Sequence, residues 1–504
     1  MMKIGNIKHT LLVGLAVTVV GCYDLEQPNP NLPTESSFWK TEDQLYQGLV
    51  ATYDQLQSGI MWAQQVRVFT TLLSDEGTNE APFEFNALAR FTLDDINFAI
   101  DLWLGHYELI GRAYQVIDRA PEIDGAGVPR IEAEAKFFVA YGYYNLISFF
   151  GENISYVDEI QAAADRPRAA IDGELWALAE QYLQEAIPEL PLAGEISPSE
   201  YGRITRGAAQ ALLGKVHMQQ GEYGEAEPYL REVIESGQYQ LNDNFEDNFT
   251  ELNFVNPEAV FVVNFRHNGV TAETDNRVDF RLFSLAEAKG AFGDVQSTNF
   301  IVDEFLQEND VDGNQDPRLN ATIFWEGSDR LYYGETHAWW MENTGVFNPD
   351  VNTAYYKYSE QAAVADNDNG NNIINDVDGG TDHIVIRYAD VLLSYAECLN
   401  ETGSGDPYPY VDIVRTRSNM EPLSDANPGL GQDAFREQLK HERLLELAGE
   451  AVRFFDLKRW GDYGPSSADN DPNFETFSIG QDEVFPIPQE ELDLNPNLSQ
   501  NPGY

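Results

Sequence analysis

The densest group of charged residues in the sequence lies near its carboxyl end. Glu442, Glu446, Glu450 and Arg453 are spaced by four, four and three residues, which places them on one face of a helix. Two neighbouring carboxylates could serve as general acid and general base in hydrolysis. A packing stripe of apolar residues accompanies them, at Leu444, Leu447, Ala448, Ala451 and Phe455. The pattern therefore favours a structural ion network that ties this helix to the rest of the protein.

Other catalytic motifs are missing from the sequence. His441-Glu442 lacks the second histidine of a zinc-protease motif. The seven histidines are scattered, and the two cysteines lie at 22 and 398, so no metal-ligand spacing arises from them. No phosphate-binding loop, dinucleotide fingerprint or Gly-x-Ser-x-Gly element occurs. We therefore predict that the protein is not an enzyme and uses no cofactor.

Two stretches rich in Asp and Asn could bind calcium. The first is Asp310-x-Asp312-Gly313-Asn314-x-Asp316. The second offers Asp366, Asp368, Asp376, Asp378 and Asp382 as weak candidate ligands. Oxygen ligands in a glycine-bearing loop suit a hard cation, but neither stretch has the glycine and glutamate positions of an EF-hand. We expect solvated loops here, with bound calcium as the alternative.

Aromatic residues are the stronger signal for binding, because they make up 12% of the chain and several fall in loops. Flat rings stack on sugar faces, while amide, carboxylate and guanidinium groups hydrogen-bond to hydroxyls. The candidate ligand-binding residues are Trp62, Asp75, Asn79, Phe83, Phe85 and Arg90 in an early loop region, and Trp325, Arg330, Tyr332, Tyr333, Trp339, Trp340 and Asn343 in the middle of the chain. The alternative for each is packing within its own loop. Trp103, Trp176 and Trp460 are expected to be packing residues.

These loops need a scaffold, and its clearest signature is a helical hairpin at residues 206–234. Apolar and small residues recur there at helical spacing on two segments, which are separated by Gly221. Leu213-Gly214, Ala226 and Leu230 fit a tetratricopeptide repeat. Gln210 and His217 replace the Trp and Tyr usual in that repeat. One such hairpin cannot bury its own apolar face, so neighbouring helices must cover it.

Helical patterns also occur at 103–114, 131–150, 175–187, 384–400 and 434–460, and after a capping box formed by Thr41 and Gln44. Residues 58–97 are expected to form loops. Short apolar runs such as 259–265 indicate strands in a middle region that otherwise lacks helical periodicity. We therefore predict one mainly α body at 41–504. Its helical scaffold spans about 41–240 and 384–460, its loop-rich excursion about 241–383, and its proline-rich tail 461–504.

The amino terminus has the pattern of a bacterial lipoprotein. Lys3 and Lys8 precede an apolar run at 11–20, which is too short to span a bilayer but typical of a signal peptide. The run ends in Val-Val-Gly-Cys, which resembles a lipobox whose Cys22 is acylated. We predict a signal peptide at 1–21, an extended lead at 22–40 and a lipid anchor, which leaves Cys398 without a disulfide partner. An ordinary signal peptide is the alternative.

The formal net charge is −53 at pH 7, with 84 acidic and 31 basic residues. No basic stripe occurs, which argues against a nucleic-acid partner. The acidic residues are spread along the chain, as expected for a solvated surface.

Four stretches together resemble the SusD/RagB family of outer-membrane nutrient-binding lipoproteins. They are EAEAKFF at 132–138, IRYADVLL at 386–393, RF and DLKRW within 453–460, and FPIP at 485–488 with QNPGY at 500–504. Val139, Asn153-Ile154 and Asp412 depart from the residues usual in the family. These are scaffold positions, so they do not change the expected fold.

The resemblance implies a mainly α fold of tetratricopeptide-like hairpins with a loop-rich ligand-binding half. It also implies a lipid-anchored, surface-exposed protein of the outer membrane in a Gram-negative bacterium. Such a protein partners a SusC-like TonB-dependent transporter barrel and delivers an oligosaccharide, or in some members a peptide. The family builds its site from an early loop and the middle excursion. The alternatives are a periplasm-facing tetratricopeptide assembly scaffold and a glycan-cleaving lipoprotein.

Overall fold

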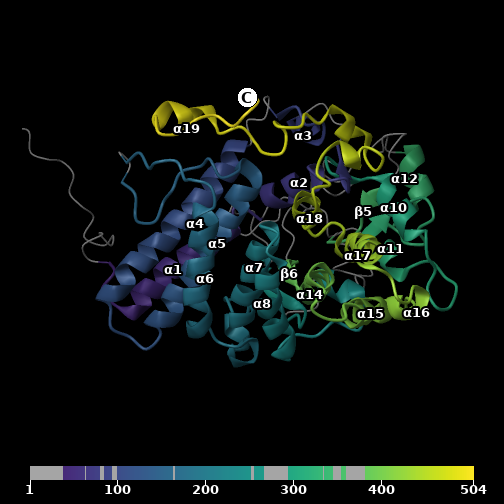
Figure 1. Ribbon diagram of the computed structural model, residues 1–504, viewed down its shortest axis with the longest axis horizontal. Coiled ribbons are helices and arrows are strands. Elements are labelled where there is room, and N and C mark those ends of the chain that lie inside the picture. Colours follow the sequence, from purple (N-terminus) through teal and green to yellow (C-terminus); the bar gives the residue numbers. More distant parts are fainter. Residues whose placement is uncertain are drawn as a thin grey trace, which may run out of the picture.

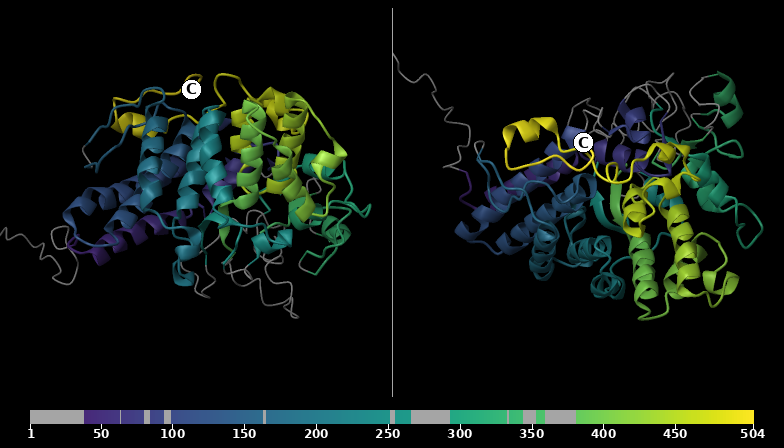
Figure 2. Two further views of the ribbon diagram at one scale, coloured as in Figure 1. Left: turned by 60° about the horizontal axis from the view of Figure 1, so that its bottom comes forward. Right: turned by 45° about the horizontal axis from the view of Figure 1, so that its top comes forward.

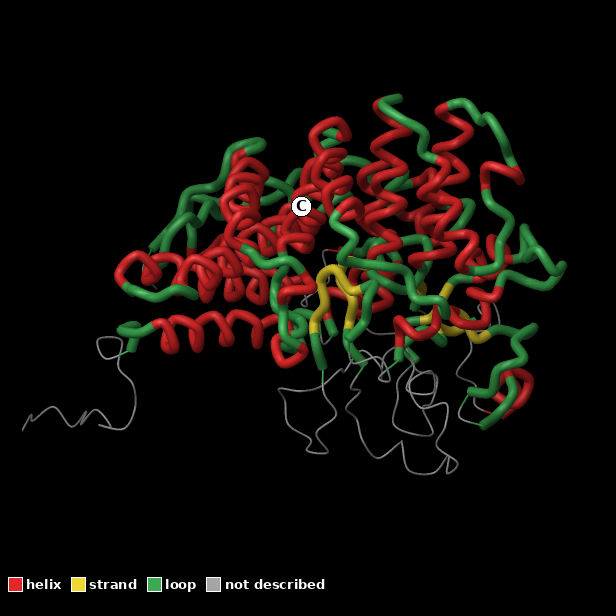
Figure 3. The backbone as a smooth tube through the Cα atoms, turned by 90° about the horizontal axis from the view of Figure 1, so that it is seen from below, coloured by secondary structure: helices red, strands yellow, loops and turns green. Residues whose placement is uncertain are grey.

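The computed structural model describes residues 38–504, except 63, 80–83, 94–98, 163–164, 251–254, 266–292, 333, 344–352 and 359–380. Helices dominate the described residues, and the strands among them form small two-stranded antiparallel sheets (Figure 1, Figure 3). The prediction of a mainly α fold is confirmed. No described helix is both long enough and apolar enough to cross a membrane.

The amino-terminal half is a row of packed helices, each in contact with the next (Figure 1). They are α1 (Glu42–Leu56), α4 (Ala99–Arg119), α5 (Val128–Phe150), α6 (Glu174–Ala186), α7 (Arg206–Gln219) and α8 (Tyr223–Glu235). The predicted capping residues begin α1, where the Gln44 backbone N–H donates to Thr41 Oγ1 at 3.3 Å and Gln44 Oε1 accepts from the Lys40 N–H at 2.8 Å. Apolar helix faces bury against each other along the row, which stabilises it.

The predicted hairpin at 206–234 is confirmed as α7 and α8. A Cβ added at Gly214 would lie 2.8 Å from Leu230 Cδ2, so glycine allows the two helices to approach closely. Gly221 turns the chain with a φ of +76°, a conformation that favours glycine. Helix α8 then packs on α14 (Tyr388–Thr402), and α14 packs on α15 (Tyr408–Arg417) and α17 (Gln432–Leu447). The helical row therefore continues into the carboxyl-terminal half.

Two helical predictions in the carboxyl-terminal half are wrong in part. Residues 384–387 belong to strand β6 (His383–Arg387), which pairs with β2 (Ala259–Val263), the strand predicted from the apolar run. The predicted helix at 434–460 is two helices, α17 and α18 (Arg453–Trp460). Between them Gly449 and Ala451 have φ values of +76° and +64°, which end the helical path. Tertiary contacts override the local helical pattern at both places.

The region at 58–97, predicted as loops, contains secondary structure. Its elements are α2 (Gln65–Leu72), β1 (Gly77–Thr78) and α3 (Glu84–Ala89). Every residue of α2 is buried. The helix has only eight residues, which is shorter than the window over which helical periodicity can be recognised in a sequence.

Short elements from the middle and the carboxyl-terminal part of the chain lie around these helices. They are β3 (Gln296–Ser297), α10 (Asn299–Phe305), α11 (Pro317–Thr322), β4 (Ile323–Phe324), α12 (His337–Asn343), β5 (Ala354–Tyr355), α16 (Leu423–Ala426) and α19 (Gln489–Leu494). Single 3-10 turns lie at Ala120–Glu122, Ile187–Glu189, Ala193–Glu195, Pro198–Glu200, Phe245–Phe249, Pro465–Ser467 and Pro472–Thr476.

The carboxyl-terminal tail, yellow in Figure 2, runs back over the amino-terminal half. The Phe485 N–H donates to the Phe149 carbonyl at 2.7 Å, and Asn501 Nδ2 donates to the Phe150 carbonyl at 2.8 Å. These bonds fasten the last residues of the chain to the end of α5.

Candidate ligand-binding site

The charged group near the carboxyl end is a buried ion network, as predicted. Glu442 and Glu446 lie on α17, Glu450 follows its end, and all three are buried. Arg318 Nη1 bridges Glu442 and Glu446 at 2.6 and 3.0 Å. Arg387 contacts Glu446 and Glu450 at 2.7 and 2.8 Å. Each carboxylate is thus occupied by at least two cationic groups.

The electrostatics of this network argue against acid-base catalysis. Burial alone would raise the pKa of Glu446, but the charges of Arg417, Arg387 and Arg318 overcome this effect and hold the pKa well below its usual range. A carboxylate that stays ionised and fully paired has no proton to donate at neutral pH. The geometry therefore supports the structural interpretation of these residues.

Arg453 belongs to a different contact. Its guanidinium forms a two-pronged ion pair with Asp75, with both N–O distances at 2.7 Å. Asn470 Nδ2 also donates to Asp75 at 2.8 Å. Asp75 was predicted to bind ligand, but its side chain is fully buried. It instead joins the early region to α18, almost 380 residues further along the chain.

The structure brings the early region and the middle excursion together. Strand β1 pairs with β3, β3 packs on β5, and β5 pairs with β4. Thr298 Oγ1 donates to the Asp75 carbonyl at 2.8 Å, and the Tyr355 hydroxyl donates to the Glu76 carbonyl at 2.7 Å. Two regions about 220 to 280 residues apart therefore share one supporting framework.

Most of the predicted ligand-binding side chains in this framework are buried. They are Trp62, Asp75, Asn79, Phe85, Tyr332 and Trp340. Trp62 Nε1 donates to the Tyr141 hydroxyl at 2.6 Å, and its ring stacks on His383 with the centroids 4.4 Å apart. Asn79 Nδ2 donates to the Asp294 carbonyl. These side chains have little or no exposed surface in the described structure, where they support the framework, and their role as ligand contacts stays a prediction.

Trp339 is 39% exposed, more than any other predicted ring that the structure describes. It lies on helix α12 and not in a loop. Its ring meets Trp340 edge-on with the centroids 5.5 Å apart, and Trp340 meets Tyr332 at 5.8 Å. Trp340 Nε1 donates to the Tyr332 carbonyl at 2.8 Å, and Tyr332 stacks on Phe324 at 5.2 Å. A column of rings therefore runs from the core to Trp339 and holds it at the surface.

Trp325 and Arg330 lie half-buried on the turn that precedes α12. Trp325 Nε1 donates to Asn320 Oδ1 at 3.0 Å, and a Cβ added at Gly327 would overlap the ring, so a larger residue there would displace it. Arg330 pairs with Glu246 at 2.7 Å. Both side chains are held by protein partners before any ligand arrives.

The remaining predicted residues are dispersed. Asn343 is exposed and donates to the Trp339 carbonyl at 2.8 Å, and Arg90 is exposed beside the tail, where Thr476 donates to its carbonyl at 2.7 Å. No ring contact or hydrogen bond joins Trp325 to Trp339 within the described part of the chain. Phe83, Tyr333, the lipidation residue Cys22, and the calcium candidates Asp366, Asp368, Asp376 and Asp378 lie outside the described residues.

Sequence reasoning missed two exposed apolar residues on the same segment. Leu331 is 51% exposed and Met341 is 36% exposed. Together with Trp339 they are three exposed large apolar side chains within a short stretch of the chain. Little in the sequence signalled this exposure, because the same seven-residue helix also carries the polar residues Glu342 and Asn343, which could have been its outward side.

Of the two candidate calcium-binding stretches, the first is fully described by the structure and the second is described only at its end. In the first stretch Asp310 Oδ1 accepts the backbone N–H groups of Asp312 and Asn314 at 3.0 and 2.8 Å, which lowers the pKa of Asp310. Asp316 begins α11 and pairs with buried Arg318 at 2.7 Å. Protein groups therefore contact both of these carboxylates. In the second stretch only Asp382 is described, and its Oδ1 accepts from the Phe265 N–H at 2.8 Å.

The packing-residue predictions fit the described structure. Trp103 and Trp176 are buried, and half-buried Trp460 donates its indole N–H to Glu397 at 2.9 Å. Cys398 is buried with a free thiol.

The geometry defines a class of protein. A row of paired helices carries a second half in which short elements support an aromatic, partly apolar surface around α12, and the strongest carboxylate cluster of the described residues is structural. In this arrangement a helical scaffold supports an accessible surface formed by short elements and loops, which is where binding residues commonly lie.

Comparison with known proteins identifies the family. The family model described as "SusD family" matches residues 257–504, and the one described as "Starch-binding associating with outer membrane" matches residues 24–218. The chain belongs to the SusD family, which confirms the resemblance found in the sequence.

Individual relatives agree with this assignment. SusD-like protein P2 of Formosa agariphila is 29% identical over 539 aligned residues, which cover 99% of each chain. A SusD superfamily protein from Bacteroides vulgatus has a similar fold, with a TM-score of 0.78 and 23% identity over 93% of this chain and 100% of that one. A laminarin-binding SusD-like protein has a TM-score of 0.74 and 25% identity over 92% of this chain and 100% of that one.

Proposed function

We propose that the protein is a surface-exposed lipoprotein of the outer membrane that captures an oligosaccharide and delivers it to a SusC-like TonB-dependent transporter barrel. Its membership of the SusD family supports this function, because one matching family model is described by starch binding and by association with the outer membrane. A laminarin-binding protein of similar fold supports a carbohydrate ligand. The lipobox-like sequence before Cys22 supports the lipid anchor.

The observation that carries the proposal is the exposed ring of Trp339 on its buried column. A sugar ring stacks best on a flat aromatic surface that is already held in place, since little side-chain entropy is then lost on binding. Asn343 and Arg330 on the same part of the chain supply hydrogen-bonding groups for hydroxyls. The site would be shallow, and its affinity would come from several weak contacts along an oligomer.

The net charge of −53 bears on the class of sugar. A strongly acidic protein repels anionic ligands such as uronates and accepts neutral glycans more readily. Calcium held by the stretch at 366–382 could bridge an anionic sugar to the protein, so the ligand test should be run with and without calcium.

The test is a binding titration with the chain from Tyr23 onward, which keeps every residue that the structure describes. The ligands are neutral glucans, including laminarin and starch oligomers, together with polyuronates and peptides. Trp339→Ala should weaken binding of a neutral glucan by about tenfold, the equivalent of one stacking contact of about 1.4 kcal/mol. Ile479→Ala is the matched control, because Ile479 is a 78% exposed apolar residue on the tail.

The outcomes separate the alternatives. Glucan binding that survives Trp339→Ala would keep the function but move the site away from α12. Binding of peptides without glycans would replace the proposed ligand by a peptide. Failure to bind any glycan or peptide, combined with protection of the protein from protease added to whole cells, would favour a periplasm-facing scaffold. Release of shortened products from a polysaccharide would indicate a glycan-cleaving lipoprotein.

A further inference from the structure

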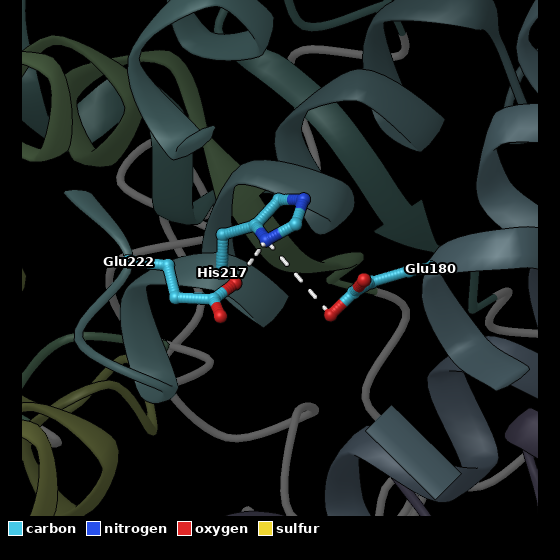
Figure 4. A group of neighbouring side chains, drawn as sticks. All are labelled: Glu180, His217 and Glu222. Carbon is cyan, nitrogen blue, oxygen red and sulfur yellow. Dashed lines mark hydrogen bonds and ion pairs between the residues drawn. The ribbon is translucent and has the colours of Figure 1, made fainter. Parts of the chain in front are cut away.

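A group of side chains in the helical half, far from α12 in the sequence, has the composition of a metal site. Glu180 lies on α6, His217 lies near the end of α7, and Glu222 lies in the turn between α7 and α8. Figure 4 shows the imidazole Nδ1 and the two carboxylates turned toward a common point. One potential ligand atom from each residue lies within 4.8 Å of the others. Within the described part of the chain, this is the only group of three or more potential protein ligands with that spacing.

The distances suit a small divalent cation. His217 Nδ1 is 2.8 Å from Glu222 Oε2 and 3.8 Å from Glu180 Oε1. Zn²⁺ binds nitrogen and oxygen ligands at about 2.0–2.1 Å, so neighbouring ligand atoms in a tetrahedral shell lie about 3.3 Å apart. The distance from His217 to Glu222 is about 0.5 Å shorter than this value, and the distance from His217 to Glu180 is about 0.5 Å longer. The 2.8 Å contact is a hydrogen bond in this structure, so an ion bound at Nδ1 would replace that bond and move the two glutamate side chains by small rotations.

The protein does not balance the charge of the two carboxylates with a basic residue. Among the described residues, no Lys or Arg forms an ion pair with Glu180 or Glu222. The buried carboxylates of the α17 network, by contrast, each contact at least two cationic groups. Two carboxylates at this separation repel each other. A protonated His217 would offset one negative charge, whereas a divalent cation would offset both.

Neighbouring groups hold the imidazole and one carboxylate in place. The His217 side chain is 7% exposed, and its ring lies parallel to that of Tyr229 with the centroids 5.9 Å apart. Gln220 Nε2 donates to Glu180 Oε1 at 2.7 Å, as a group outside the coordination shell would do. The Glu222 side chain is 46% exposed, so one side of the group is open to an ion from solvent.

We propose that Glu180, His217 and Glu222 bind a divalent transition-metal ion of the Zn²⁺ class, with water completing the coordination. One imidazole nitrogen and two carboxylate oxygens suit Zn²⁺, Ni²⁺ or Cu²⁺, whereas Ca²⁺ prefers a shell made of oxygen alone. The ion connects α6 to the α7–α8 hairpin and stabilises the row of helices. This site is separate from the proposed carbohydrate surface, and its existence does not depend on that function.

The test is calorimetric titration of Zn²⁺ into the metal-stripped chain from Tyr23 onward, purified without a polyhistidine tag. The unaltered protein should bind about one equivalent, and its thermal midpoint should rise when Zn²⁺ is added. His217→Gln keeps a polar side chain but removes the nitrogen ligand. Loss of a group outside the coordination shell typically weakens metal binding by about 10–100-fold. Because His217 would be a direct ligand, His217→Gln should weaken Zn²⁺ binding by at least that factor. The same titration with Ca²⁺ should show much weaker binding.

Two further variants make the result interpretable. His441→Gln is the matched control, because His441 lies 3.4 Å from Glu304 in a histidine–glutamate pair outside this group, and it should leave Zn²⁺ binding unchanged. Glu222→Gln alters a half-exposed side chain in a turn, so the protein should fold normally and still lose affinity. The proposal is overturned if the unaltered protein binds no Zn²⁺, Ni²⁺ or Co²⁺. It is also overturned if both His217→Gln and Glu222→Gln, folded by circular dichroism, bind Zn²⁺ as tightly as the unaltered protein.

Discussion

Replacing Glu446 by glutamine should lower the free energy of unfolding by about 3–5 kcal/mol, the range for removing one partner from a buried ion pair. The Glu446 carboxylate is fully buried and accepts hydrogen bonds from Arg387 at 2.7 Å, from Arg318 at 3.0 Å and from Arg417. Glutamine has nearly the same shape, so packing is preserved. The loss arises because each of the three guanidinium groups loses one of its negatively charged partners in a buried site.

Glu437→Gln is the matched control for this change. Glu437 lies on the same helix, but its side chain is 70% exposed and its distance to Lys440 is 3.4 Å. An exposed pair of this kind contributes about 0–1 kcal/mol. Urea unfolding followed by circular dichroism would measure both variants, with unchanged slopes indicating that the midpoints report stability. The reasoning is refuted if the two variants differ by less than about 1 kcal/mol.

The difference in unfolding free energy between Glu446→Gln and Glu437→Gln should depend on pH. The pKa of Glu446 is held well below its usual range in the folded protein, although burial alone would raise it. Its stabilising contribution is therefore complete above the unfolded-state pKa of about 4.3 and is lost as the pH falls through the folded-state pKa. The gap between Glu446→Gln and Glu437→Gln should be widest at neutral pH and should narrow in acid. A gap that widens in acid would contradict the assigned charge state.

Two further predictions concern the helical half. Burial lowers the pKa of His106 to about 4, so the unfolded chain binds a proton before the folded protein does, and stability should fall as the pH drops from about 6.5 to 4. His106→Asn can still donate to the Leu102 carbonyl, and it should reduce the dependence of stability on pH, measured as urea midpoints at pH 7 and 5. An unchanged dependence on pH would assign the effect to other groups. Gly214→Ala should lower stability by about 1–3 kcal/mol through overlap with Leu230, whereas Gly224→Ala, with nothing within 4 Å of the added Cβ, should be neutral or stabilising by up to about 1 kcal/mol. Equal thermal midpoints for the two glycine variants would contradict the close approach of α7 and α8.

Local patterns in the sequence determined much of the helical half and the family. The period of apolar residues predicted α1, α4, α6 and α8, each of which buries one face and exposes the other. It also predicted α5 and α7, although these two helices are buried on almost all sides. The capping residues Thr41 and Gln44 act within one turn, so they too could be recognised locally. The spacing of Glu442 and Glu446 predicted an ion network, but not its partners. Arg318 and Arg387 come from segments 59 to 128 residues away.

Only the tertiary structure decided which polar and aromatic residues face solvent. Trp62 and Asp75 looked like ligand contacts in the sequence, yet Tyr141, His383 and Arg453 from distant segments enclose them. The same holds for Trp339 and Trp340, which are adjacent in sequence but differ in exposure because one side of α12 packs on Tyr332. The grouping of Glu180 with His217 likewise required α6 to pack on α7. Residue type and spacing encode local structure, but exposure depends on which distant segments cover each side chain.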